Sequence, residues 1–233
     1  MSSKLAVLRT LLRGKGLSFY VVGSADRHNN EYTHPSDGLR RWISEFTGSA
    51  GTAIVGLDSA HLFTDGRYFA QANRELGSDW ELHRVGDRVG EEQAVVNWMP
   101  WLAGVKGKIG IDPAVISLAE YRTLLSNLAE SGNRAEIVPI EENLVETVWN
   151  QASENGWEVR PSLVQAECFK LGIEYTGEES GSKIARLRAE LEKEGGLEGV
   201  VVSSLDQIAC ESIAILSILN LRSLLIRLIS DIC

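Results

Sequence analysis

Histidines are the side chains in this sequence whose chemistry best suits metal binding or proton transfer at neutral pH. There are four of them: His28, His34, His61 and His83. No two have the spacing of a His-Glu-x-x-His motif, in which one turn of helix brings both rings to the same metal ion. A single histidine in a strand, such as His61, is far more often a packed or surface residue than a ligand. The histidines therefore predict no metal ligand and no catalytic residue.

A glycine-rich segment at residues 48–52, reading GSAGT, is similar to a phosphate-binding loop. Such loops end in Gly-Lys-Ser/Thr and run into a helix, whose N-terminus helps to bind the anion. Here that ending is missing, and a strand follows in place of a helix. We therefore predict a close approach of backbone between a helix and a strand, rather than a phosphate site.

The Asp65-Gly66 pair is a turn signal, and Arg67 and Tyr68 follow it directly. Two interpretations stay open. In the first, Asp65 caps the next helix and Arg67 is an ordinary solvated cation. In the second, Arg67 stands at a functional site where it meets a carboxylate.

The acidic residues and the thiols give no stronger signal. Glu31 and Asp37 could serve as acid–base carboxylates, but carboxylates are common in polar loops. The cysteines, Cys168, Cys210 and Cys233, are far apart and odd in number, which fits neither a disulfide framework nor a zinc site. They are typical of buried or free thiols in a reducing compartment.

The composition indicates a globular protein, because 44% of the 233 residues are hydrophobic and 24% are charged. Asp and Glu outnumber Lys and Arg by 32 to 23, a formal charge of −9, so we expect no nucleic-acid partner. The N-terminus has no long apolar segment, and no stretch reaches the roughly 18 apolar residues that a membrane-spanning helix needs. These features predict a cytoplasmic protein without a membrane span.

Helical and strand patterns alternate along the first 150 residues, which predicts an α/β fold with a mixed sheet flanked by helices. Two strands lie so close together in sequence, at 53–55 and 61–64, that we expect them to be antiparallel. Asp37 is the expected cap of a helix over 39–46, and Ser117 with Glu120 forms a capping box. The other predicted strands are 17–22, 80–85, 108–111 and 135–140. The other predicted helices are 5–12, 68–76, 91–103, 118–128 and 143–149.

The domain organisation follows from the polar segment in the middle of the chain. We predict a first domain over 1–150, a linker over 151–161 and an incomplete second α/β domain over 162–209. That second domain has a helix over 182–194 and a strand over 199–203. Residues 210–233 are a divergent apolar tail, with Arg222 and Arg227 the only charges between Ile213 and Ile229.

Several segments, taken in order from about Phe19 to Ala209, resemble the front part of eukaryotic Xaa-Pro aminopeptidases in the aminopeptidase P and creatinase group. Three positions depart from the family pattern: Gly23 replaces proline, Glu45 replaces glycine and Cys210 replaces tryptophan. The segments that carry the resemblance read VGSADRHNNEYTHPSD at 22–37, RRWISEF at 40–46, FTGSAGTA at 46–53, TDGRYF at 64–69, GIDP at 110–113, IEENLVETVW at 140–149, YTG at 175–177 and LDQIA at 205–209.

The resemblance implies a domain arrangement and the place of the catalytic metals within it. In this family two related α/β domains precede a C-terminal domain, where Asp, Asp, His, Glu and Glu hold two metal ions, usually manganese. Those metals activate the water that cleaves the peptide bond before proline. The front domains shape access to that site and mediate oligomer contacts.

By that resemblance this chain is a front portion that lacks the metal-binding domain, has no cofactor of its own and is non-catalytic. The full-length family is expected to use a peptide substrate and two manganese ions, and a homo-oligomer is expected. Arg67 and Tyr68 match a family motif, so they are the candidates for substrate access or an interface. The alternative is a non-catalytic binding or regulatory module that associates with a full-length relative.

Overall fold

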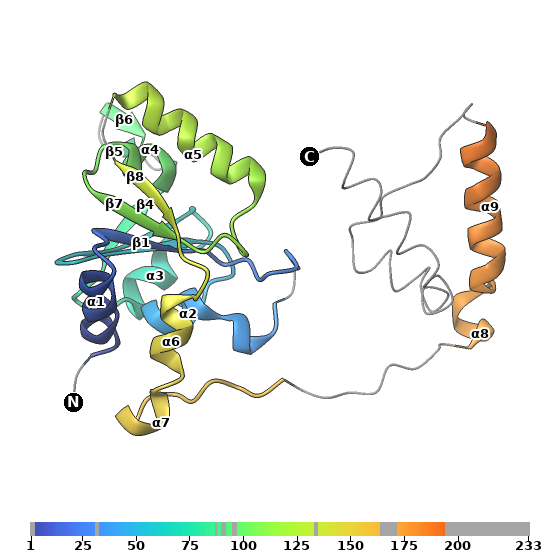
Figure 1. Cartoon of the computed structure of the whole chain (residues 1–233). Coiled ribbons are helices and arrows are strands. Elements are labelled where there is room, and N and C mark those ends of the chain that lie inside the picture. The colour runs from blue at the N-terminus through green and yellow to red at the C-terminus, as the bar shows by residue number, and fades with distance from the viewer. Residues whose placement is uncertain are drawn as a thin grey trace. The chain divides into compact units, whose positions relative to one another are not determined.

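The computed structural model describes residues 3–30, 33–86, 88–89, 92–94, 97–132, 135–163 and 172–193. The chain divides into two compact units, Met1–Leu163 and Val164–Cys233. Figure 1 shows the sheet and its helices in the first unit. Each unit is described by itself.

A six-stranded sheet in the order β4-β3-β2-β1-β7-β8 forms the centre of the first unit. Only β2 is antiparallel to its neighbours, β1 and β3, and a short turn joins it to β3. The predicted mixed sheet and the predicted antiparallel pair are both confirmed. The strands are β1 (Phe19–Val22), β2 (Thr52–Gly56), β3 (Ala60–Thr64), β4 (Glu81–Arg84), β7 (Lys108–Ile111) and β8 (Glu136–Pro139).

Helices cover both faces of the sheet (Figure 1). On one face, α1 (Lys4–Gly14), α2 (Leu39–Ser44) and α6 (Leu144–Trp149) bury their apolar sides in the larger core cluster. On the other face, α4 (Trp98–Ala103) and α5 (Leu118–Ser131) pack in a second cluster. This three-layer arrangement buries the apolar surface of the sheet on both sides.

The remaining elements of the first unit are short. A 3-10 turn, η1 (Pro35–Asp37), precedes α2, and α3 (Phe69–Glu75) connects β3 to β4. A separate two-stranded ribbon consists of β5 (Arg88–Val89) and β6 (Glu92–Ala94), and α7 (Ala152–Asn155) follows α6.

One predicted helix start and one predicted N-cap are wrong. The helix predicted over 91–103 is only α4, because Asn97 caps it at Trp98 and Pro100 lacks the N–H that a longer helix would need there. Asp37 does not cap α2, whose N-cap is Gly38 without a side-chain hydrogen bond. That helix ends at Glu45, whose φ of 62° is left-handed. Glycine adopts this conformation without strain, which explains the family's preference there.

The buried face of α5 is formed by Leu124 and Leu128. Its capping box is confirmed, since Ser117 and Glu120 satisfy each other's backbone N–H groups. However, Leu118 and Leu125 remain 61% and 42% exposed, while Leu124 is fully buried.

The segment predicted as a linker, residues 151–161, packs against the first unit, which extends to Leu163. The stacked indoles of Trp42 and Trp149, 5.0 Å apart, both donate hydrogen bonds to the Glu158 carbonyl, and Trp157 meets Trp42 edge-on. Aromatic burial and paired N–H groups fix this segment to the domain.

In the second unit the structure describes α8 (Ile173–Thr176) and α9 (Ser180–Lys193). The latter confirms the helix predicted near 182–194. The predicted strand at 199–203, the apolar tail at 210–233 and all three cysteines lie outside the described residues. Among the residues that are described, no helix is long and apolar enough to cross a membrane.

Candidate functional site at the carboxyl edge of the sheet

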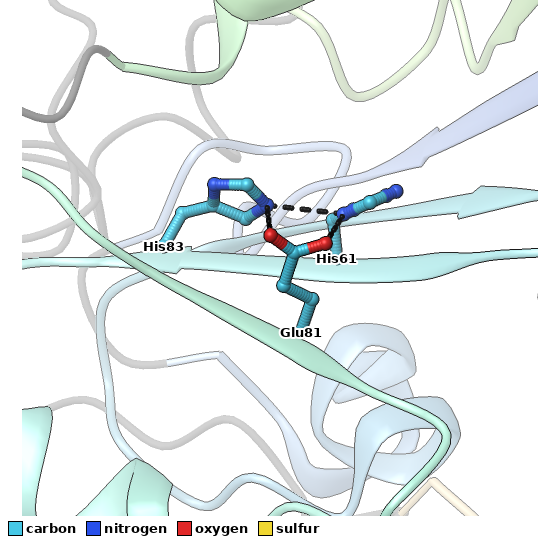
Figure 2. A group of neighbouring side chains, drawn as sticks. All are labelled: His61, Glu81 and His83. Carbon is cyan, nitrogen blue, oxygen red and sulfur yellow. Dashed lines mark hydrogen bonds and ion pairs between the residues drawn. The ribbon is translucent and has the colours of Figure 1, made fainter.

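The structure brings two of the four histidines together. Parallel pairing of β3 and β4 places His61 opposite Glu81, and His83 lies two residues further along the same face. The rings meet at 3.0 Å between His61 Nδ1 and His83 Nε2, with the Glu81 carboxylate beside both (Figure 2). Sequence analysis missed this group because its members come from two strands separated by α3. The alternation Glu81-x-His83 in a predicted strand was the available signal.

A cavity of about 450 Å³ opens at another place, where β1, β3 and β7 end. The chain runs outward from β1 toward β4, then crosses back to β7, so β1 and β7 flank a topological switch point. In open α/β sheets, ligands bind in the crevice outside the carboxyl ends of the strands at such a point. This cavity is therefore the candidate functional site of the fold.

Arg40 supports one wall of the cavity by holding Ser24, which lines it. Its side chain is 5% exposed and donates hydrogen bonds to Ser24 Oγ, at 2.8 Å, and to the carbonyls of Phe46, at 3.0 Å, and Gly48. Burial lowers the pKa of Arg40 to about 10, which still leaves the guanidinium charged at neutral pH. Among the described residues no carboxylate pairs with it, so backbone and hydroxyl oxygens stabilise this buried cation.

The glycines of residues 48–52 are required by close contacts, as predicted. A Cβ at Gly48 would lie 2.3 Å from the Phe46 ring, and one at Gly51 would lie 2.9 Å from the Phe63 carbonyl. Ser24 donates to the Gly51 carbonyl at 2.7 Å, which continues the hydrogen-bond chain from Arg40. The segment is a packed crossing that lines the cavity and leads into β2.

Asp26 orders the loop that leaves β1 beside the cavity. Its carboxylate is buried and accepts hydrogen bonds from the amides of His28 and Asn30 and from the Asn30 side chain, at 2.6–3.0 Å. Burial favours the protonated acid, but these hydrogen bonds outweigh it and hold the pKa of Asp26 below its ordinary value.

Asp112 and Asn143 line another side of the cavity. Both are buried, and the Asn143 amide donates to the Asp112 carboxylate at 2.9 Å. Asn143 is also the N-cap of α6, and its side-chain oxygen accepts hydrogen bonds from the amides of Val145 and Glu146, at 3.0 and 3.2 Å. The end of β7 and the start of α6 are thereby held together by one side-chain pair.

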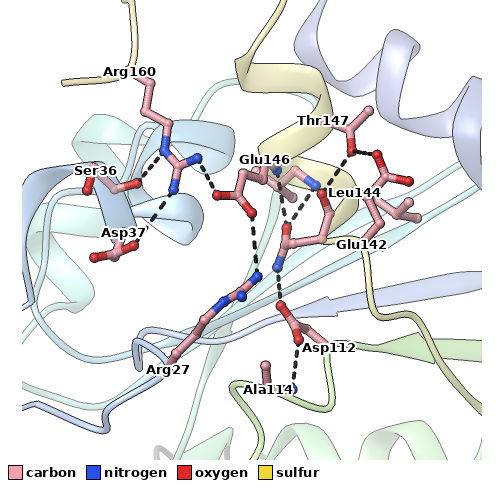
Figure 3. Close-up of polar contacts among 12 residues, drawn as sticks. Arg27, Ser36, Asp37, Asp112, Ala114, Glu142, Leu144, Glu146, Thr147 and Arg160 are labelled. Carbon is pink, nitrogen blue, oxygen red and sulfur yellow. Dashed lines mark hydrogen bonds and ion pairs between the residues drawn. The ribbon is translucent and has the colours of Figure 1, made fainter. Parts of the chain in front are cut away.

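An ion-pair network anchors the segment after α7 next to this wall (Figure 3). Arg160 donates to the Ser36 carbonyl at 2.8 Å, and its guanidinium contacts Glu146 and lies 3.7 Å from Asp37. Arg27 lies 3.9 Å from the other Glu146 oxygen. Asp37 is therefore a partner in an ion-pair network rather than an acid–base residue. Glu31 lies outside the described residues.

Arg67 and Tyr68 lie at the rim of the cavity, where each contacts a residue of its lining, Asp65 or Ser49. The Arg67 guanidinium is 67% exposed and binds both oxygens of Asp65, at 2.9 and 2.8 Å. The carboxylate that Arg67 binds therefore belongs to Asp65, in the same turn. Asp65 accepts the Arg67 amide within the turn and does not cap α3, whose N-cap is Tyr68. The Tyr68 hydroxyl meets Ser49 Oγ at 2.5 Å, which ties the rim to the glycine loop.

The carboxylates that line the cavity all have partners within the protein. Of its lining carboxylates, Asp65 binds Arg67, Asp112 binds Asn143 and Glu120 serves the capping box. Within the lining, no hydroxyl lies beside a histidine base, as nucleophilic catalysis would need. The geometry offers a polar-edged recess with its acidic groups already paired.

The mixed sheet with helices on both faces defines an α/β domain. A cavity lies at the carboxyl edge of this sheet, beside the glycine-rich loop to which Arg40 donates hydrogen bonds. A family model described as the Creatinase/Prolidase N-terminal domain matches residues 4–148, and a second model of the same description matches 159–222. The chain belongs to the creatinase/prolidase N-terminal domain family.

Its relatives include two fungal proteins, each called "Probable Xaa-Pro aminopeptidase P". That of Podospora anserina is 42% identical over 211 residues, and that of Neurospora crassa is 41% identical over 211. In both cases the match covers 89% of this chain and 29% of the relative, so the chain spans about three tenths of their length.

A solved structure, the X-prolyl aminopeptidase of Caenorhabditis elegans, is similar with a TM-score of 0.63 and 29% identity. The similarity covers 82% of this chain and 31% of that one, which is described as a cytosolic enzyme with a di-nuclear active site. These findings confirm the resemblance to Xaa-Pro aminopeptidases and the predicted fold class.

The first prediction concerns Arg40. Replacing Arg40 with Met should lower the free energy of unfolding by roughly 3 kcal/mol, because buried carbonyls lose a charged donor that no water replaces. Arg41→Met, at the exposed neighbouring position, should change it by less than about 0.5 kcal/mol. Urea unfolding followed by circular dichroism measures both. Equal effects of the two substitutions would contradict the role given to Arg40.

The stability that the Asp26 carboxylate contributes should depend on pH. The folded pKa of Asp26 is depressed, so its contribution to stability is fully present above the unfolded value near pH ~4 and is lost as pH falls through the folded value. Asp26→Asn should cost about 1 kcal/mol at pH 7 and progressively less in acid. Unfolding curves recorded at several pH values test this, with exposed Asp58→Asn as control. A difference between wild type and Asp26→Asn that does not narrow in acid would count against it.

Proposed function

We propose that this chain forms the front portion of an Xaa-Pro aminopeptidase, a metal-dependent enzyme that removes an N-terminal residue preceding proline. The observation that supports it most strongly is the match of 89% of the chain to fungal proteins of that name. We assign the reaction to the longer protein. This chain contributes the rigid front domain with its carboxyl-edge cavity, and residues 162–209 begin a second domain of the same kind.

The two-metal centre, with two manganese ions, belongs to the longer protein in this proposal. Among the described residues, one group of at least three potential metal ligands is found: His61, Glu81 and His83. It offers two imidazoles and one carboxylate, whereas the ligand set that the resemblance implies has four carboxylates and one histidine. The group does not fit a di-nuclear centre of that kind, and no step of peptide hydrolysis is derived from it.

Arg67 and Tyr68 would act at a substrate-access or subunit interface. The Arg67 guanidinium is exposed and extends over the Tyr68 ring at 5.2 Å, while Asp65 orients it. A cation fixed on a turn at the rim of a cavity is well placed to meet a carboxylate of a peptide or of a second copy of the chain. A peptide substrate, a homo-oligomer and a cytoplasmic location complete the proposal, the last by analogy with the cytosolic Caenorhabditis elegans enzyme.

The direct test is hydrolysis of an Xaa-Pro peptide by the purified chain with added manganese. We expect no release of the N-terminal residue above that of a mock purification. Activity that follows the protein through purification would contradict the assignment of the reaction to the longer protein.

A second test addresses the rim. If Arg67 lies in a homo-oligomer contact, Arg67→Ala should raise the dissociation constant of the oligomer in sedimentation velocity runs. The substitution should leave thermal unfolding almost unchanged, since exposed ion pairs contribute little to stability. Arg74→Ala, an exposed arginine on α3, is the matched control. A chain that is monomeric at every concentration, or an oligomer indifferent to Arg67→Ala, would exclude the interface role.

A further inference from the structure

Beyond the proposed function, we propose that His61, Glu81 and His83 form a binding site for one divalent transition-metal ion, with zinc the best-suited occupant. The site lies on the sheet face that carries Phe63, against Trp101 of α4. It is separate from the carboxyl-edge cavity, whose lining contains none of the three residues.

The spacing of the donor atoms fits a single tetrahedral ion. His61 Nδ1 lies 3.0 Å from His83 Nε2 and 3.2 Å from one Glu81 oxygen, and the other Glu81 oxygen lies 3.7 Å from His83 Nε2 (Figure 2). Two ligands of a tetrahedral zinc ion, at bond lengths of about 2.0–2.1 Å, stand roughly 3.3–3.4 Å apart. The observed separations bracket that value, but they involve both Glu81 oxygens. With one donor atom from each residue, the three atoms lie within 4.8 Å of one another, so the exposed Glu81 side chain must turn to complete the geometry.

A proton cannot satisfy these three groups equally well. One proton on His61 Nδ1 can be donated to His83 or to Glu81, and the exposed Glu81 carboxylate then takes its other hydrogen bonds from water. Neutral imidazole rings offer lone pairs to a metal ion. A divalent cation placed between the three donors would be shared by all of them.

The surroundings hold the ligands in place. His61 Nε2 lies 2.8 Å from Ser59 Oγ, and an N–H donated there leaves Nδ1 free to bind metal. Such a contact to the second ring nitrogen is the usual way in which a protein orients a metal-binding histidine. The His83 ring stacks on Phe63 at 4.2 Å, and Trp101 covers both rings.

The exposure of the ligands gives an ion a way in. The His61 and His83 side chains are only 9% and 13% exposed, whereas Glu81 is 66% exposed and can swing aside and return. Three protein ligands leave a fourth position for water. Two imidazoles favour zinc, copper or nickel over magnesium or calcium, which prefer oxygen. The bound ion would fasten the edge strand β4 to β3.

The test is isothermal titration calorimetry with zinc chloride on the whole chain. All proteins carry Cys168→Ser, Cys210→Ser and Cys233→Ser, because thiolates also bind zinc. We expect one ion per chain and a rise in thermal midpoint that a chelator reverses. Cobalt loaded in place of zinc should show visible absorption bands of a nitrogen–oxygen site.

Three variants decide between a built site and adventitious binding. His83→Gln and Glu81→Gln should each weaken zinc binding by at least about tenfold. Glu81→Gln keeps the test valid if His83→Gln fails to fold, since Glu81 is mostly exposed. His28→Gln, which removes an exposed histidine elsewhere, should leave affinity unchanged. Absence of saturable binding, or affinity that survives both ligand substitutions, would overturn the proposal and leave a proton-only cluster.

Discussion

The Arg40 guanidinium is the interaction on which the carboxyl edge of the sheet depends. It reaches the carbonyls of Phe46 and Gly48 and the hydroxyl of Ser24 from inside the domain. The chain must pass from α2 into β2 through a tight crossing that has no regular backbone ladder. A planar side chain with five donors in a fixed fork reaches these oxygens from three different nitrogens, whereas the three donors of a lysine all leave one atom.

Further hydrogen bonds connect Arg40 to the rest of the glycine-rich loop. Ser24 passes the interaction on to Gly51, and Ser49 of the same loop meets Tyr68 at the rim. The position of the cavity wall and that of the exposed Arg67 turn are therefore linked through one buried cation. On the other side of the cavity, Asp112 and Asn143 make the corresponding link between β7 and α6.

Much of the resemblance to the aminopeptidase family thus has a structural cause. The RRWISEF and FTGSAGTA segments meet through Arg40, and the GIDP and IEENLVETVW segments meet through Asp112 and Asn143. Tyr20 adds a contact of its own, since its buried hydroxyl accepts the Leu144 amide at 3.3 Å. These motifs build a domain that positions surfaces, and they carry no hydrolytic chemistry by themselves.

Local sequence patterns predicted the helices and strands well, but they predicted less well which segments pack against one another. Alternation, the capping box at Ser117 and the short turn between β2 and β3 were sufficient for the mixed sheet, because each acts within a few residues. The packing of residues 151–161 was not visible, since it depends on Trp42, more than 100 residues earlier in the chain. Polar composition there suggested a linker, although two indoles and Arg160 anchor the segment.

The candidate sites show the same difference between local motifs, which sequence analysis detects, and contacts between distant segments, which it does not. Arg67 and Tyr68 were suggested by a motif, and in the structure they contact Asp65 and Ser49, which line the cavity. The His61, Glu81 and His83 group was not found, because it requires the parallel register of β3 on β4, which no local pattern fixes. Two residues of one face, Glu81 and His83, were adjacent in the alternation, but the third ligand comes from a strand on the other side of α3.

Nitrogen-15 NMR of the arginine side chains tests the central role of Arg40 most directly. A guanidinium held by three fixed oxygens should give resolved, slowly exchanging Nε–H and Nη–H signals at neutral pH. Those signals should vanish in Arg40→Lys, which assigns them. Signals that average by rapid rotation and exchange with water for every arginine would show that Arg40 does not hold the loop, and the account of the cavity wall would fail.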